Sequence, residues 1–131
     1  MGEILYENEI VSLIYVRTDR LIELQWKLKS TSDEFKKSFL LAADFAKKNK
    51  VQFFLSDIRN EGLVDIEDIR WLEQVILPQA VDVGVQRIAI IAEESLYSNL
   101  YAETLKKKIE RLPISVGLFT DVSSARSWVL K

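Results

Sequence analysis

Three short and almost wholly apolar runs, each followed by an amphipathic helical pattern, constrain the fold of this 131-residue chain more than any other feature. The runs are residues 51–55, 88–92 and 114–120. Short apolar runs are typical of strands that are covered on both faces. Strands that alternate with helices pair in parallel through right-handed crossovers. The pattern therefore predicts the parallel part of an α/β sheet.

The beginning of the chain follows a different pattern. Residues 3–8 and 10–17 are short segments, and the second is rich in β-branched and aromatic residues. After a predicted turn at 18–20, apolar side chains alternate with polar ones from Ile22 to Leu28, which is typical of a strand with one solvated face. These segments predict an antiparallel meander at one edge of the sheet.

Helical periodicity and capping residues predict about four helices. Thr31 and Glu34 form a capping box at the first of them, and Asp65 and Asp121 are N-cap candidates for the second and the last. Pro78 lies inside the second helix and predicts a kink or break there. The first predicted helix follows Thr31 and has Lys47 to Lys50 at its other end, the second and third cover about residues 66–83 and 98–111, and the last runs from the Asp121 cap through Val129. We expect one domain, residues 1–131, with a mixed sheet of about six strands.

Composition excludes several classes of function. Cysteine and histidine are absent, so disulfides, thiolate chemistry and histidine-based catalysis or metal binding are excluded. The net charge of −2 gives no field that would attract nucleic acid. No signal peptide or membrane-spanning apolar run is found, so we expect a cytoplasmic location. We predict no cofactor and no metal site.

Several charged residues follow the ends of the predicted parallel strands, where α/β sheets bind their ligands. Asp57 and Asp121 are candidates for an acid–base pair or for holding a hard cation. In the alternative interpretation Asp121 caps a helix, and Asp57 pairs with Arg59 or with loop amides. We favour this structural interpretation. Glu93 and Glu94 follow the middle strand.

The second predicted helix carries the more specific candidate site. At about 100° per residue, its core face is predicted to contain Ile69, Leu72, Ile76, Ala80 and Val83. Trp71, Val75 and Pro78 then point mostly the opposite way and form an outward apolar patch, unless a loop or the kinked half of the helix covers Trp71. Tyr97 and Tyr101 either line a pocket with Trp71 or anchor their own helix. Two other tryptophans, Trp26 and Trp128, fit core patterns.

Three stretches carry a resemblance to a known family. Residues 53–58 resemble a central strand that runs into a polar loop, residues 64–69 the start of a second helix, and residues 119–128 a closing strand and helix. In these features the chain resembles the STAS-like family, which includes the bacterial anti-sigma-factor antagonists and the short SpoIIAA-like proteins.

The resemblance implies this fold and a role in binding a protein partner. Regulatory members have Asp-Ser-Ser-Gly at the start of the second helix, where a serine accepts phosphate. Here Asp65 fits the aspartate, but Ile66 and Glu67 occupy the serine positions. We therefore expect no phosphoserine switch, and Glu67 would act only as a fixed negative charge.

We predict a non-enzymatic binding or regulatory module that acts through protein–protein interaction, with homodimer formation as one version. The alternative function is a carrier or sensor of a small apolar ligand or lipid. An enzyme that uses Asp57 and Asp121 is the third and least supported hypothesis. The predicted partner- or ligand-binding residues are Trp71, Val75, Glu67, Asp57, Arg59, Tyr97 and Tyr101.

Overall fold

A six-stranded mixed sheet forms the centre of the described residues, which in this computed structural model are 2–131 apart from the side chains of Leu96 and Tyr97. Its strands are β1 (Glu3–Glu7), β2 (Val11–Val16), β3 (Leu21–Trp26), β4 (Phe53–Asp57), β5 (Arg87–Ile91) and β6 (Ser115–Phe119). The order across the sheet is the order along the chain. β1, β2 and β3 pair antiparallel, and β3 to β6 pair in parallel. The predicted meander and the predicted parallel part are both confirmed.

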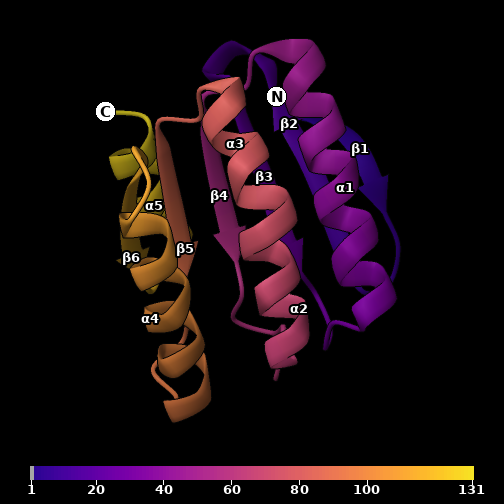
Figure 1. Cartoon of the computed structure of the whole chain (residues 1–131), viewed down its shortest axis with the longest axis vertical. Helices are drawn as coiled ribbons and strands as arrows, with labels where there is room; N and C mark the ends of the chain where they lie inside the picture. The colour runs from indigo at the N-terminus through magenta and orange to yellow at the C-terminus, as the bar shows by residue number, and fades with distance from the viewer. Residues whose placement is uncertain (1) are drawn as a thin grey trace.

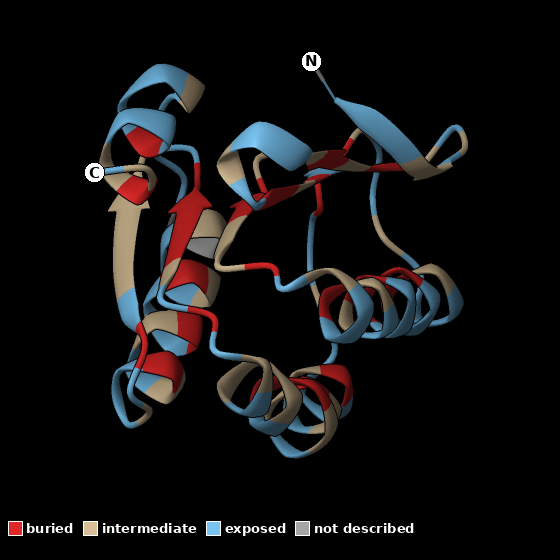
Figure 2. Cartoon of the chain, turned by 90° about the horizontal axis from the view of Figure 1, so that it is seen from above, coloured by how far each residue is buried: buried red, intermediate tan, exposed pale blue. Residues whose placement is uncertain are grey.

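The helices form two unequal layers. They are α1 (Ser32–Asn49), α2 (Ile66–Trp71), a π-helical turn (Leu72–Ile76), α3 (Leu77–Val83), α4 (Leu96–Glu110) and α5 (Val122–Val129). Because each parallel crossover steps to the next strand in the same direction, the connecting helices lie on one face of the sheet. Only α5 lies on the other face, against β4, β5 and β6 (Figures 1 and 2). Within residues 2–131, no helix is both long enough and apolar enough to cross a bilayer.

The helix ends follow from local residues. The Thr31 hydroxyl oxygen accepts a hydrogen bond from the Glu34 amide at 3.2 Å, which confirms the predicted cap of α1. Gly84 ends α3 with φ +97°, a conformation that glycine adopts at little cost. The irregularity predicted at Pro78 occurs just before it, because the π-helical turn ends at Ile76. The segment 66–83 is thus one helical rod with a wide turn in its middle.

The core has two parts, one on each face of the sheet. The larger part lies under α1, α2, α3 and α4 and includes Trp26, Phe35 and Leu72. The smaller part lies under α5, where Ala125 and Val129 pack on Leu21, Leu55, Ala89 and Ile91. The half-buried Trp128 packs on Phe119 with ring centroids 5.5 Å apart. Both tryptophans that were predicted to be structural therefore pack in the core.

Trp71 does not point outward as the helical wheel predicts. Its side chain is half-buried and packs edge-on against Phe35 of α1, with ring centroids 6.3 Å apart. The Lys36 amine lies 6.0 Å from the centre of the indole ring. The helical-wheel prediction considered only one packed face of this helix, the one toward the sheet. In the structure α1 also packs against the side of the helix (Figure 2). Trp71 therefore joins two helices and is not an exposed patch.

We expect Trp71→Ala to lower the free energy of unfolding by about 2–3 kcal/mol, because the contact with Phe35 and the apolar area under α1 are lost. Chemical denaturation followed by circular dichroism measures this change. Ile66→Ala, on the exposed first turn of the same rod, is the control, with an expected change below about 0.5 kcal/mol. Equal effects of the two changes would contradict the structural role of Trp71.

Candidate functional site

The carboxyl ends of the parallel strands meet at one end of the sheet, the lower end in Figure 1. The loops after β3, β4 and β5 lead from this end into α1, α2 and α4. Ligands of open α/β sheets bind at this end. The charged residues predicted from sequence lie at this end, with Asp57 as the last residue of β4, Arg59 and Glu93 in the loops after β4 and β5, and Asp121 after β6.

Asp57 and Arg59 form a bidentate ion pair. The buried Asp57 carboxylate accepts hydrogen bonds from Arg59 Nε at 2.9 Å and from Arg59 Nη2 at 2.7 Å, and also from the Arg59 amide at 3.2 Å. The hydrogen bond to Asp57 raises the pKa of the Arg59 guanidinium. This two-pronged geometry is the strong form of a charge-assisted pair. The favoured structural interpretation of Asp57 is confirmed.

Asp121 is an N-cap. Its carboxylate accepts hydrogen bonds from the Ser124 amide at 2.8 Å and from the Ser124 hydroxyl at 3.0 Å, and it begins α5. These bonds lower the pKa of the Asp121 carboxyl. Asp57 and Asp121 are thus occupied in separate structural contacts, so the structure gives no support to an acid–base pair.

The residues predicted to share one face of the second helix differ in exposure. Asp65 occupies the N-cap position, although its side chain makes no cap hydrogen bond, and Glu67 is exposed in the first turn. Trp71 and Val75 are half-buried and pack against the main core. Trp71 and Val75 are therefore less open to a partner than Glu67. The side chain of Tyr97, another predicted site residue, lies outside the described part of the structure.

A buried acidic residue, Glu61, was missed by the sequence analysis. Its side chain is 1% exposed, and neither carboxylate oxygen has a hydrogen-bond partner of regular geometry among the described residues. Burial raises the pKa of the Glu61 carboxyl to about 8, and the hydroxyls of Ser30 and Tyr101 only partly oppose this rise. Burial and the proximity of Glu61 also raise the pKa of Tyr101 well above its ordinary value. The neighbour of the Tyr101 hydroxyl is thus the Glu61 carboxyl.

A second buried carboxylate lies on α2, near this group. Asp68 accepts a hydrogen bond from the Ser32 hydroxyl at 2.6 Å, which joins α2 to the first turn of α1. Its negative charge also contributes to the raised pKa of Tyr101. No local pattern identifies Glu61 or Asp68, because both are acidic residues in segments where exposed acids are common. Only contacts between segments that are far apart in the sequence reveal them.

Large aliphatic side chains are exposed around this end of the sheet. We name as the carboxyl-end patch Leu28, Leu63, Ile66 and Leu100, which are 54%, 62%, 70% and 56% exposed. They come from the loops after β3 and β4, from the first turn of α2 and from the second turn of α4. Single exposed leucines are ordinary, but several at one end of a domain indicate a contact surface.

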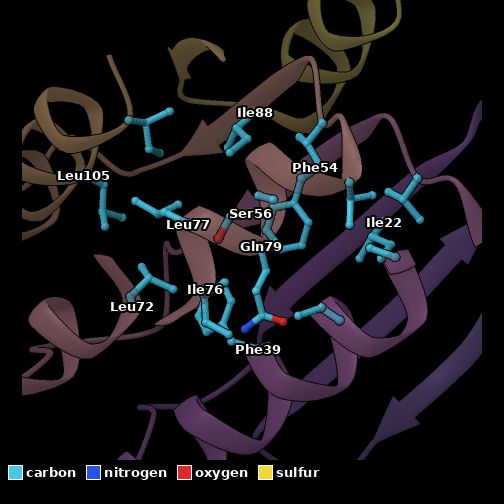
Figure 3. Close-up of a pocket in the computed structure, with 18 of the residues that line it drawn as sticks. Ile22, Phe39, Phe54, Ser56, Leu72, Ile76, Leu77, Gln79, Ile88 and Leu105 are labelled. Atoms are coloured by element: carbon cyan, nitrogen blue, oxygen red, sulfur yellow. The ribbon is translucent and has the colours of Figure 1, made fainter. Parts of the chain in front are cut away.

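An apolar cavity lies between the sheet and the helices, mostly toward the amino ends of the parallel strands (Figure 3). Its volume is about 80 Å³. Ile22, Phe54, Ile88 and Ile90 line it from the sheet, and Phe39, Leu72, Ile76 and Leu105 line it from the helices. The cavity is separate from the Glu61 group, since none of its lining residues belongs to that group.

The buried Glu61 carboxyl predicts an unusual pH dependence of stability. The folded protein holds this proton up to about pH 8, whereas the unfolded chain loses it near the ordinary value of 4.5, so stability falls as pH rises through this window. Glu61→Gln removes this fall, and at pH 8 it should gain on the order of 4 kcal/mol relative to the parent. Thermal unfolding from pH 5 to pH 9 measures the difference, with Glu94→Gln on the exposed loop as the control. The same pH profile for parent and Glu61→Gln would contradict the burial of an uncompensated carboxyl.

Comparisons with known proteins agree with this architecture. No protein-family model matches the chain, and no curated protein matches it either. Among solved structures, the chain is similar to an uncharacterised protein of the DUF3478 family from Shewanella loihica PV-4, described as having a SpoIIAA-like fold. The superposition has a TM-score of 0.56 with 16% sequence identity, and it covers 98% of this chain and 92% of the other. The resemblance seen in the sequence is confirmed at the level of the fold: this chain has a SpoIIAA-like fold.

Proposed function

We propose that this chain is a non-enzymatic binding module whose partner is a protein that docks on the carboxyl-end patch. The observation that carries the proposal is the exposure of four large aliphatic side chains at one end of the sheet. Ile66 and Leu63, the most exposed of them, are three residues apart in the chain, where the loop after β4 enters α2. Removing such side chains from water is the main favourable contribution to protein association.

The charges around the patch indicate the chemistry of the partner. Asp65, Glu67, Glu93 and Glu94 are exposed in the loops and first turn that carry its apolar residues, and the exposed Lys29 packs on Gly62 beside Leu63. The positive charge of Arg59 is largely neutralised by Asp57. A partner with an apolar centre and charges of both signs around it would complement this surface, because complementary charges speed association and select the partner.

The fold supports the same location. The resemblance to STAS-like proteins places the phosphorylated serine of regulatory members at the start of the second helix, where this chain has Ile66 and Glu67. Both residues are exposed at the beginning of α2. An isoleucine at this position offers an apolar contact that no kinase can switch, and Glu67 places an acidic side chain beside it.

The non-enzymatic part of the proposal is supported by how the acids at this end are used. Asp57 is bound on both oxygens by Arg59, and Asp121 is held by the amide and hydroxyl of Ser124. Glu61 has the pKa of a general acid or base, but its side chain is closed off from solvent. A general base must reach the proton that it removes.

The test compares Ile66→Asp with Leu40→Asp, a matched change at a 49% exposed site on the outer face of α1. We expect Ile66→Asp to weaken binding of the partner, or self-association if the partner is a second copy, by at least about 100-fold, because a charge replaces a central apolar contact. Leu40→Asp should bind like the parent. Sedimentation velocity measures self-association, and quantitative cross-linking in the native host measures other partners. A partner that binds both variants and the parent equally would contradict docking on the patch, as would a parent protein that is monomeric and forms no cross-links.

A second candidate function, binding of a small apolar ligand, is favoured by the cavity. The cavity is lined almost entirely by carbon atoms and lies between the sheet and α1, α3 and α4. Ligand sites in proteins are concave and mostly apolar, with a few polar groups. A cavity of about 80 Å³ is smaller than most such sites, so a carried molecule would have to be small or would have to widen the cavity.

Native mass spectrometry of freshly purified protein tests this second function. We expect a fraction of the protein to carry a small neutral molecule, and extraction into organic solvent should release it. A single mass equal to that of the bare chain, together with an empty extract, would count against a carrier function in the cell.

A further inference from the structure

The chemistry of the cavity wall limits what the cavity can hold. No charged side chain lines it, and Ser56 and Gln79 are its polar residues. Ser56 is buried on β4, at the sheet side of the cavity, and Figure 3 shows it among the apolar side chains. A carboxylate or ammonium group would find no charged partner here, and burying an unpaired charge costs much more than burying a hydroxyl.

The cavity reaches the surface between α1 and α3. Among its lining residues, those that keep partial exposure lie mostly on these two helices: Ala43, Gln79, Ala80 and Val83. The side of α1 that faces α3 also carries Ala42 and Ala46, so small side chains line both walls of the gap. The Gln79 amide donates a hydrogen bond to the Val75 carbonyl oxygen at 2.7 Å, which holds this polar group at the edge of the gap on its own helix.

The wall on the α3 side contains the π-helical turn. Leu72 and Ile76, the first and last residues of the turn, both line the cavity, and so does Leu77 directly after it. Pro78 has no amide hydrogen, so the regular helical bond to the Gln74 carbonyl is not available. Single π-helical turns inside helices occur frequently at functional sites. Here the wide turn lies between α2 and α3 and interrupts their regular helical bonding.

The volume of the cavity is too small for a ligand of several carbons unless the walls move apart. An engineered protein cavity of about 150 Å³ lined by aliphatic and aromatic residues holds benzene. The cavity of this chain has about 80 Å³, so a chain of several carbons fits only if α3 moves away from α1. The small side chains along the gap give such a chain a path to the surface.

We infer that the cavity binds an uncharged molecule with a single short alkyl chain, which enters between α1 and α3 and is accommodated by movement of α3 at the π-helical turn. This inference rests on the second candidate function and specifies its ligand class. The Ser56 hydroxyl at the inner end, or the Gln79 amide at the gap, supplies the hydrogen bond for a single hydroxyl group of the ligand.

The test uses two ligands with the same chain and different charge, 1-hexanol and hexanoate, in titrations followed by amide chemical shifts. We expect 1-hexanol to cause saturable shifts in α1, α3 and the π-helical turn, and hexanoate to bind at least about tenfold more weakly. Equal binding of the two, or shifts confined to other surfaces, would overturn the inference.

Two substitutions locate the site. Ala80→Leu fills the cavity and should weaken 1-hexanol binding at least about tenfold, whereas Asp82→Leu, at an exposed position of the same helix outside the cavity wall, should leave it within about twofold. If Ala80→Leu does not fold, Ala46→Val on the opposite wall makes the same test. Unchanged binding in a folded cavity-filling variant would overturn the inference. The two proposals can fail separately. If the purified protein carries no molecule in native mass spectrometry but still binds 1-hexanol, the carrier function is contradicted and the inferred ligand class is supported.

Discussion

The parallel pairing of β3, β4, β5 and β6 in sequence order is the constraint on which the rest of the molecule depends. Each crossover moves one strand in the same direction, so the handedness of βαβ units places α1, the α2–α3 rod and α4 side by side on one face. This arrangement brings all the loops that leave β3, β4 and β5 to one end. It also leaves a space between neighbouring helices that only their side chains can fill. The patch, the Glu61 group and the cavity all arise from that single layer of helices.

At the carboxyl end of the sheet, several charged side chains stabilise the fold, whereas aliphatic side chains are exposed to solvent. The guanidinium of Arg59 is held on Asp57, and Asp121 holds the start of α5. Asp68 joins α2 to α1 through the Ser32 hydroxyl. Acidic residues that could suggest catalysis from the sequence therefore make structural hydrogen bonds and ion pairs. The exposed groups that remain for a partner are aliphatic, with charged residues of both signs around them.

Much of the fold was predictable because it follows from local rules. The caps of α1 and α5 and the apolar strands β4 and β5 are determined by nearby residues, and all of them are found as predicted. The predicted alternation holds in β3 from Ile22 to Trp26, but Leu28 lies beyond the strand and is exposed. The site was less predictable, because burial in a loop depends on distant segments. Glu61 is buried by the chain around Ser30 and by Tyr101, which are 31 and 40 residues away in the sequence. Trp71 was placed outward because helical periodicity shows one face of a helix but not the helix packed beside it.

The sequential strand order has a consequence for how the chain assembles. Every strand pairs with a strand next to it in the sequence, so the sheet can grow from β1 to β6 without waiting for a distant partner. During synthesis each new βα unit can dock on the edge already formed. The opposite face is different, because Leu21, Leu55 and Ala89 remain bare until α5 has left the ribosome. A stall or cleavage just before Val122 would thus leave a nearly finished sheet with one apolar face open to other nascent chains.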